Sequence, residues 1–248
     1  MKVKTILVSQ PAPTSENSPY FSLEKKLKLN IDFRSFIHVE GCSAKEIRDQ
    51  KIDLAEFTAV ILTSRNAADH FFRVAEEMRF KVSDDMKYFC QSEAIANYLQ
   101  KYIVYRKRKI YIGGRTFQDL SKHIKKHETE KFLLPSSNKL QASIPTLLDG
   151  LNIKWTNVTF FKTVVSDLSD LSDVKYDILA FFSPSGIDSL LKNFPDYEQG
   201  KTRIAVFGKT TVKATEEAGL RVDIMAPTPE TPSMTMALEK YIKEVNKK

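Results

Sequence analysis

The segment FFSPSGIDSLL, residues 181–191, places two aromatic residues and a short polar turn directly before an apolar pattern with helical spacing. The turn consists of Ser183, Pro184, Ser185 and Gly186. A strand that ends at such a turn and leads into a helix is typical of a parallel α/β sheet. The first N–H groups of a helix lack intrahelical partners, so the turn is either an ordinary N-cap or an anion-binding site.

Four other turns in the sequence have the same character. Each follows a short apolar run and supplies a hydroxyl or a glycine where a helix is expected to begin. They are TSRNA at 63–67, IGGRT at 112–116, PSSNK at 135–139 and FGKTT at 207–211. Because ligands of open parallel sheets bind at the carboxyl ends of the strands, these turns are candidate binding sites.

The candidate ligand-binding residues come from these turns and are numerous. Besides Ser183, Pro184, Ser185 and Gly186, they are Thr63, Ser64, Arg65, Asn66, Gly114, Arg115, Ser136, Gly208 and Lys209. Lys139 adds a further cation. Hydroxyls, main-chain N–H groups and cations together favour an anionic ligand.

The alternation of apolar runs and helical patterns extends along the whole chain and predicts an α/β fold. Ten runs are expected to be strands: 5–10, 35–40, 59–64, 87–91, 109–114, 131–137, 158–165, 177–183, 203–208 and 222–227. Helices are expected at 21–29, 66–79, 92–101, 116–127, 139–149, 186–193, 210–218 and 232–246, the last of them with Thr231 as N-cap. Ten strands are enough for two parallel sheets.

Three stretches of the first half recur in order in the second half. LNIDFRSFIHVE at 29–40 aligns with LNIKWTNVTFFK at 151–162, Thr63 aligns with Ser183, and Cys90 aligns with Gly208. The spacing between matched positions stays close to 120 residues. We interpret this pattern as a duplicated α/β unit.

Composition limits the class of protein. The chain has 248 residues, of which 42% are hydrophobic and 28% charged, as in globular proteins that bury a core. The apolar run at the start is too short for a signal peptide, and no run approaches a membrane span, so a cytoplasmic location without membrane contact is expected. Two cysteines, Cys42 and Cys90, lie too far apart for a C-x-x-C motif and are expected to be reduced.

The formal net charge of +7 suits a polyanionic partner, and the densest basic clusters are YRKRK at 105–109 and KHIKKH at 122–127. These clusters lack interleaved aromatic residues, so nucleic acid is not expected as a partner. His123 and His127 have zinc-ligand spacing but no third ligand, and no metal site is expected. Neither a G-x-S-x-G motif nor the glycine spacing of nucleotide-binding loops occurs.

The segments FFSPSGIDSLLKNF at 181–194 and IAVFGKTTVKATEEAGLRVDIMAPTPETPSMTMALEKYI at 204–242 resemble uroporphyrinogen-III synthases. The resemblance extends through VILTSRNAADHFF and through the region from LLPSSNK to FFKTV, so it covers nearly all of the chain. It implies two similar parallel-sheet α/β domains, joined by two extended linker strands, with an active-site cleft between them. The first domain would contain 1–37 and 172–248, the second 42–165, and the linkers 38–41 and 166–171.

The activity that the resemblance implies is a cofactor-free lyase reaction in tetrapyrrole biosynthesis. Linear hydroxymethylbilane, which carries eight carboxylates, would lose water and close with inversion of ring D to uroporphyrinogen III, whereas spontaneous closure gives the type I isomer. The enzyme would act as a monomer, with the upstream deaminase as a transient partner. The pathway could serve haem, sirohaem or cobalamin.

Two features bear on the catalytic residues. The resemblance implies hydroxyls at Thr210 and Thr211 facing ring A of the substrate, and these form the candidate catalytic pair. The family commonly has a tyrosine where this chain has Phe161, so the proton for the departing hydroxyl must come from another source. Cys90 and Glu93 stand where the family usually has glycine and threonine. The departure at Phe161 keeps a non-catalytic binding module for an anionic tetrapyrrole as the alternative.

Overall fold

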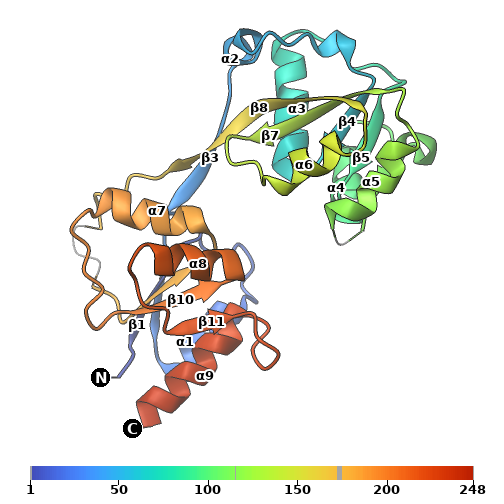
Figure 1. The fold of residues 1–248 in the computed structure, drawn as a ribbon. Coiled ribbons are helices and arrows are strands. Elements are labelled where there is room, and N and C mark those ends of the chain that lie inside the picture. The colour runs from blue at the N-terminus through green and yellow to red at the C-terminus, as the bar shows by residue number, and fades with distance from the viewer. Residues whose placement is uncertain (1, 115, 172–174, 248) are drawn as a thin grey trace. The chain divides into compact units, whose positions relative to one another are not determined.

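Short buried runs of β-branched and aromatic residues form the strands of two separate sheets (Figure 1). The computed structural model describes residues 2–114, 116–171 and 175–247. The chain divides into two units, one formed by Met1–His38 with Val164–Lys248 and the other by Val39–Thr163. We call them unit 1 and unit 2. Unit 1 therefore contains both ends of the chain.

Unit 1 is built on a five-stranded sheet in which every neighbouring pair is parallel. Its strand order is β11 (Ile224–Ala226), β10 (Arg203–Phe207), β9 (Ile178–Phe181), β1 (Thr5–Val8) and β2 (Asn30–Phe33). Because side chains alternate between the faces of a strand, Ile6 and Val8 pack on one side and Leu7 on the other. Both faces are consequently buried.

Two helices cover each face of this sheet (Figure 1). Helices α1 (Pro19–Leu27) and α9 (Met234–Lys247) contribute Leu23, Leu238 and Ile242 to the core that contains Ile6. Helices α7 (Pro184–Asn193) and α8 (Lys209–Glu217) cover the opposite face, where α7 contributes Ile187 and Leu190.

Unit 2 is built on a six-stranded sheet. Its order is β3 (Ile37–Gly41), β8 (Lys154–Val165), β7 (Lys131–Ser137), β4 (Ala59–Leu62), β5 (Lys87–Cys90) and β6 (Ile110–Ile112). The pairs from β8 to β6 are parallel. At the other edge, Cys42 N–H donates to Phe160 O over 2.9 Å and Ser166 N–H donates to Phe36 O over 3.0 Å, so the chain runs antiparallel there. Strand β3 includes the residues expected as the first linker, 38–41, whereas β8 ends directly before the residues expected as the second, 166–171.

Helices also cover both faces of the unit 2 sheet. One face packs against α2 (Ala44–Asp49), α3 (Arg65–Glu77) and α4 (Glu93–Tyr98), the other against α5 (Phe117–Lys125) and α6 (Ser143–Asp149). Three short 3₁₀ helices, η1 (Leu54–Glu56), η2 (Leu99–Lys101) and η3 (Lys107–Lys109), complete the connections.

All ten predicted strands and all eight predicted helices occur; one strand and one α-helix were missed, besides the three 3₁₀ helices. Strand β2 buries only Ile31, so its sequence lacks the run of apolar residues by which the other strands were predicted. Helix α2 spans six residues, although Ser43 and Glu46 form a capping box that the sequence displays as S-x-x-E. Helix α9 begins at Met234 rather than at 232, and its Ser233 hydroxyl accepts from Met236 N–H over 3.3 Å, so the prediction of Thr231 as N-cap was wrong.

The stretches that matched between the two halves of the sequence occupy equivalent strand positions. From one edge, unit 1 has the order β2, β1, β9, β10, β11, and unit 2 has the order β8, β7, β4, β5, β6 before β3 is added. Thr63 follows β4 and Ser183 follows β9, both on the central strand of these five. The repeat in sequence thus corresponds to one strand order used twice.

Candidate functional site

A cavity of about 440 Å³ lies in unit 2 where β4, β5 and β7 end. Its lining consists mainly of hydroxyl and amide side chains with one lysine: Thr63, Ser64, Asn66, Gln91, Ser136, Ser137, Lys139, Leu140, Gln141, Ile144 and Phe161. We call it the turn cavity. Four predicted candidates, Thr63, Ser64, Asn66 and Ser136, lie together in it.

The turn after β4 forms one wall of the turn cavity. Ser64 has an extended backbone and is the N-cap of α3, its hydroxyl accepting from Ala67 N–H over 3.0 Å. This bond satisfies one of the orphan N–H groups of the helix. The side chains of Arg65 and Asn66, the first two residues of α3, remain exposed. Ser64 is therefore a cap, and Arg65 and Asn66 are the groups that a ligand can reach.

The end of β7 supplies the opposite wall. The Ser136 side chain is 2% exposed and donates to Asn157 Oδ1 over 2.6 Å, so its role is to orient the turn. The Ser137 hydroxyl accepts from Lys139 N–H over 3.2 Å. Lys139 is the cation of the lining, which contains neither aspartate nor glutamate. Such a lining favours a carboxylate over a cation.

Phe161 of β8 borders the turn cavity with a side chain that is 7% exposed. Its ring stacks on the His70 imidazole, with 5.0 Å between ring centroids and 19° between planes. Arg73 Nε donates to His70 Nδ1 over 3.3 Å. Burial, and then the Arg73 guanidinium, lower the pKa of His70. A neutral imidazole thus lies behind the ring that borders the cavity.

The turn after β6 is arranged differently. A Cβ at Gly114 would lie 2.7 Å from Asp119 Oδ2, so the Asp119 side chain would have to shift to admit one. The same carboxylate oxygen accepts from the backbone N–H and the hydroxyl of Thr116, each over 3.0 Å. The start of α5 is thus capped by the protein's own carboxylate, and Gly114 does not line the turn cavity. The candidate Arg115 lies outside the described residues.

In unit 1, two candidate turns lie at the same edge of the sheet. Strands β9 and β10 pair in parallel with Phe181 opposite Val206, so the turns that follow them are neighbours. Ser183 caps α7 by accepting from Gly186 N–H over 3.3 Å, and Pro184 takes the first helical turn. Ser185 is partly exposed beside them. A Cβ at Gly186 would lie 3.2 Å from Phe181 Cδ1, so the backbone passes close to that ring.

The turn after β10 has a glycine as N-cap. Gly208 has φ 88° and ψ 147°, a conformation that disfavours other residues, and it offers no side chain to the first N–H groups of α8. Lys209 and Thr210 are exposed, whereas the Thr211 side chain is 1% exposed. The two threonines of the predicted catalytic pair therefore differ in solvent exposure: the Thr210 side chain is accessible to solvent, and the Thr211 side chain is not.

The sequence-based predictions missed several residues at the carboxyl ends of the strands in the two sheets. Gln91, Ser137 and Gln141 line the turn cavity, and Gln91 N–H donates to Leu62 O over 2.9 Å, which joins the ends of β5 and β4. Ser9 follows β1, and its N–H donates to Ala180 O over 3.0 Å. Ser9, Gln91 and Ser137 are polar residues at the ends of predicted strands, a signal that could have identified them, whereas Gln141 fell within the predicted helix 139–149.

The described residues contain no group of three or more His, Cys, Asp or Glu side chains placed to hold a metal ion. His127 Nδ1 instead lies 2.9 Å from His123 O, and its ring packs against Tyr111. Within the same described ranges, no helix combines the length and apolar character needed to cross a membrane.

The sequence model of the family described as "Uroporphyrinogen-III synthase HemD" matches residues 24–236. The chain belongs to the uroporphyrinogen-III synthase family. The matched region includes the turn cavity and the turns after β9 and β10. The resemblance found in the sequence is thereby confirmed at the level of the family.

Individual members of the uroporphyrinogen-III synthase family resemble the chain over nearly all of its length. A uroporphyrinogen-III synthase of Chlorobaculum parvum is 23% identical, covering 97% of this chain and 100% of the relative. The crystal structure of the Helicobacter pylori enzyme has a TM-score of 0.63 at 17% identity and covers 98% of this chain and 100% of that one. A mutant of the Thermus thermophilus enzyme has a TM-score of 0.60 at 13% identity, with 99% and 100% covered. These structures share the fold.

Proposed function

We propose that the protein cyclises linear hydroxymethylbilane to uroporphyrinogen III with loss of water and inversion of ring D, as a hydro-lyase of tetrapyrrole biosynthesis. Family membership over residues 24–236 supports this activity. The main structural support for this activity is the lining of the turn cavity, where hydroxyl, amide and lysine side chains occur without a carboxylate. A substrate with eight carboxylates requires such a surface.

We assign carboxylate binding to two sets of residues. In unit 2, Lys139, Asn66 and the exposed Arg65 offer charge and hydrogen-bond donors around the turn cavity. In unit 1, Lys209 and the uncapped start of α8 after Gly208 offer the same chemistry. Groups of this kind form charge-assisted hydrogen bonds with carboxylates.

Selectivity for the type III isomer follows from positioning. The substrate closes without a catalyst, so the enzyme must stabilise the transition state in which the substituted carbon of ring D attacks the ring A methylene. Fixing several carboxylates restricts the chain to the geometry that forms a spiro intermediate. Loss of water from ring A precedes this attack and gives an electrophilic azafulvene.

Loss of water requires a proton for the departing hydroxyl. Phe161 replaces the tyrosine that the family commonly has, and a phenyl ring cannot donate a proton. We assign the proton transfer to Thr210, acting through water or together with a carboxyl group of the substrate, because its side chain is exposed at the start of α8. Thr211 supports the turn instead, its N–H donating to Gly208 O over 3.1 Å.

The test is an isomer assay. Hydroxymethylbilane is generated in situ with purified deaminase, the protein is added, the products are oxidised, and porphyrin isomers I and III are separated by chromatography. A predominance of isomer III is expected. A product mixture identical to that without the protein would contradict catalysis and leave the alternative of a non-catalytic module that binds an anionic tetrapyrrole.

A matched pair of lysine variants links the activity to the turn cavity. Lys139→Gln removes the lysine of the turn cavity. Loss of one ion pair with a substrate carboxylate, worth up to about 1 kcal/mol, is expected to raise KM severalfold. Lys126→Gln removes an exposed cation after α5 that does not line the cavity, and is expected to leave KM unchanged. Equal effects of both variants would show that only overall charge matters.

The remaining assignments are proposals of the same kind. We propose that the protein works as a monomer in the cytoplasm without a cofactor and receives its substrate from the deaminase by transient contact. Sedimentation of the protein alone and with deaminase tests the monomer and the contact.

A further inference from the structure

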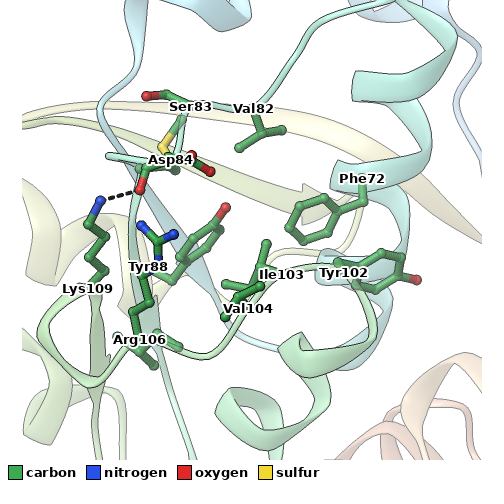
Figure 2. Close-up of a pocket in the computed structure, with 12 residues that line it drawn as sticks. Phe72, Val82, Ser83, Asp84, Tyr88, Tyr102, Ile103, Val104, Arg106 and Lys109 are labelled. Atoms are coloured by element: carbon green, nitrogen blue, oxygen red, sulfur yellow. Dashed lines mark hydrogen bonds between the residues drawn. The ribbon is translucent and has the colours of Figure 1, made fainter.

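A second cavity lies in unit 2 at the opposite edge of the sheet, where β5 and β6 begin (Figure 2). Its volume is about 330 Å³, at the lower end of the range for small-molecule sites. We call it the aromatic cavity. The turn cavity lies at the carboxyl ends of the same parallel strands, so the two sites are distinct.

The interior of the aromatic cavity is lined by apolar side chains and aromatic rings. Phe72 and Tyr102 stack with 4.4 Å between ring centroids and 9° between planes, and Tyr88 lies 6.2 Å from Phe72. Ile103 and Met86 complete the interior. Packed aromatic rings form a preformed surface against which another ring can stack or pack edge to face.

The Tyr88 hydroxyl is the one polar group of this interior that the fold leaves unused. Tyr88 is 4% exposed, yet within the described residues its hydroxyl has no hydrogen-bond partner. Figure 2 shows this hydroxyl pointing into the space enclosed by the labelled side chains. Because this hydroxyl faces the cavity, a ligand inside the cavity can form a hydrogen bond with it.

Charges of both signs border the opening. Lys109 is already occupied, because its Nζ lies 2.7 Å from Asp85 Oδ1 and donates to Asp84 O (Figure 2). Asp84 and Arg106 also line the cavity with exposed side chains. In the part of the chain that the structure describes, neither side chain forms an ion pair or a hydrogen bond. One carboxylate and one guanidinium thus remain available at the same opening.

We propose that the aromatic cavity binds a small aromatic zwitterion, such as a free aromatic amino acid. The aromatic ring of the ligand packs against Phe72, Tyr88 and Tyr102, its carboxylate pairs with Arg106, and its ammonium pairs with Asp84. The Tyr88 hydroxyl bonds to a polar atom of the ligand. A purely anionic ligand would face Asp84 unfavourably, and a hydrocarbon would leave all three polar groups without partners.

The test uses the full chain and three probes of the same size. L-phenylalanine carries both charges, 3-phenylpropionate lacks the ammonium group, and phenethylamine lacks the carboxylate. Isothermal titration calorimetry and saturation-transfer NMR measure their binding. Saturable binding of L-phenylalanine in the sub-millimolar to low-millimolar range is expected, with both analogues weaker by about three- to tenfold.

Variants connect the binding to named groups. Arg106→Gln should weaken L-phenylalanine and 3-phenylpropionate by about three- to tenfold and strengthen phenethylamine, which then no longer faces a like charge. Asp84→Asn should weaken L-phenylalanine and phenethylamine and strengthen 3-phenylpropionate, which then no longer faces a like charge. Tyr88→Phe keeps the ring and should weaken L-phenylalanine by about fivefold. Arg108→Gln, a neighbouring exposed cation outside the lining, is the control and should change nothing.

Two results would overturn the proposal. One is the absence of saturable L-phenylalanine binding up to about 10 mM, well above the affinity expected for a ligand of this size. The other is an equal effect of Arg106→Gln and Asp84→Asn on all three probes, because charge recognition would then play no part. Neither outcome bears on the isomer assay.

Discussion

The guanidinium carbon of Arg65 lies 5.3 Å from the centre of the Tyr98 ring. The Tyr98 hydroxyl in turn donates to Asp69 Oδ1 over 2.8 Å, and Tyr102 donates to the same carboxylate. Burial acts to raise the pKa of Asp69, but hydrogen bonds from Tyr102, Tyr98 and Lys101 lower it below its usual value. An ionised carboxylate therefore fixes Tyr98, and Tyr98 holds Arg65 beside the turn cavity.

We expect Tyr98→Leu to raise KM for hydroxymethylbilane about two- to fivefold with little change in kcat. The variant removes a cation–π contact worth about 0.5–1 kcal/mol at an exposed site, so Arg65 becomes less well placed for a carboxylate. Tyr98→Phe keeps the ring but loses the bond to Asp69, and should have a smaller effect. Steady-state kinetics of both variants measure this. An equal loss in kcat would show that Tyr98 does more than position Arg65.

The two threonines at the start of α8 should behave differently. Thr210→Val is expected to lower kcat about tenfold or more, because an exposed hydroxyl that relays a proton is lost. Thr211→Val changes a side chain that is 1% exposed, and kcat should stay within about twofold. Both replacements are β-branched, so the helix is affected equally. A larger loss in Thr211→Val would reverse the assignment.

Phe161→Tyr places a phenol at the edge of the turn cavity. If the departing hydroxyl takes its proton slowly in this protein, the added phenol should raise kcat severalfold, and the increase should depend on pH. Single-turnover kinetics of isomer III formation measure the effect. An unchanged kcat would show that proton delivery does not limit the rate.

Gly208→Ala should lower the free energy of unfolding by about 1–3 kcal/mol, because φ 88° with ψ 147° is a region that alanine avoids. The space around a new Cβ is open, so the cost would be conformational. Gly150→Ala is the control, since its φ of −68° suits any residue, and it should be neutral or slightly stabilising. Urea unfolding followed by circular dichroism compares the two. Similar stabilities would show that the backbone at 208 relaxes without cost.

The lowered pKa of His70 predicts a pH dependence of stability. The unfolded chain binds the proton near the ordinary value of 6.5, whereas the folded chain binds it only at lower pH. Between these values the unfolded state holds more protons, so stability should fall as pH decreases below about 6.5. His70→Gln should flatten the change in unfolding free energy between about pH 7.5 and 5.5. An unchanged pH dependence would assign the effect to other groups.

The sequence by itself determined the features that depend on local interactions. Alternating apolar runs placed all ten predicted strands, and serines before helical patterns marked the caps at Ser64 and Ser183. Hydrophobic periodicity and helix capping involve residues only a few positions apart, so both can be recognised in the sequence alone. Family membership was also visible in the sequence, because its motifs keep their order and spacing.

Only the tertiary structure decided which turns share an edge and which side chains reach it. The pairing of β4 with β5 and β7 brings Thr63, Gln91 and Ser136 to one cavity, while Gly114 lies elsewhere. Packing of α8 buries Thr211 but exposes Thr210, and the stack of His70 on Phe161 joins residues 91 positions apart in the numbering. These contacts depend on strand order and long-range packing, which residue spacing does not encode.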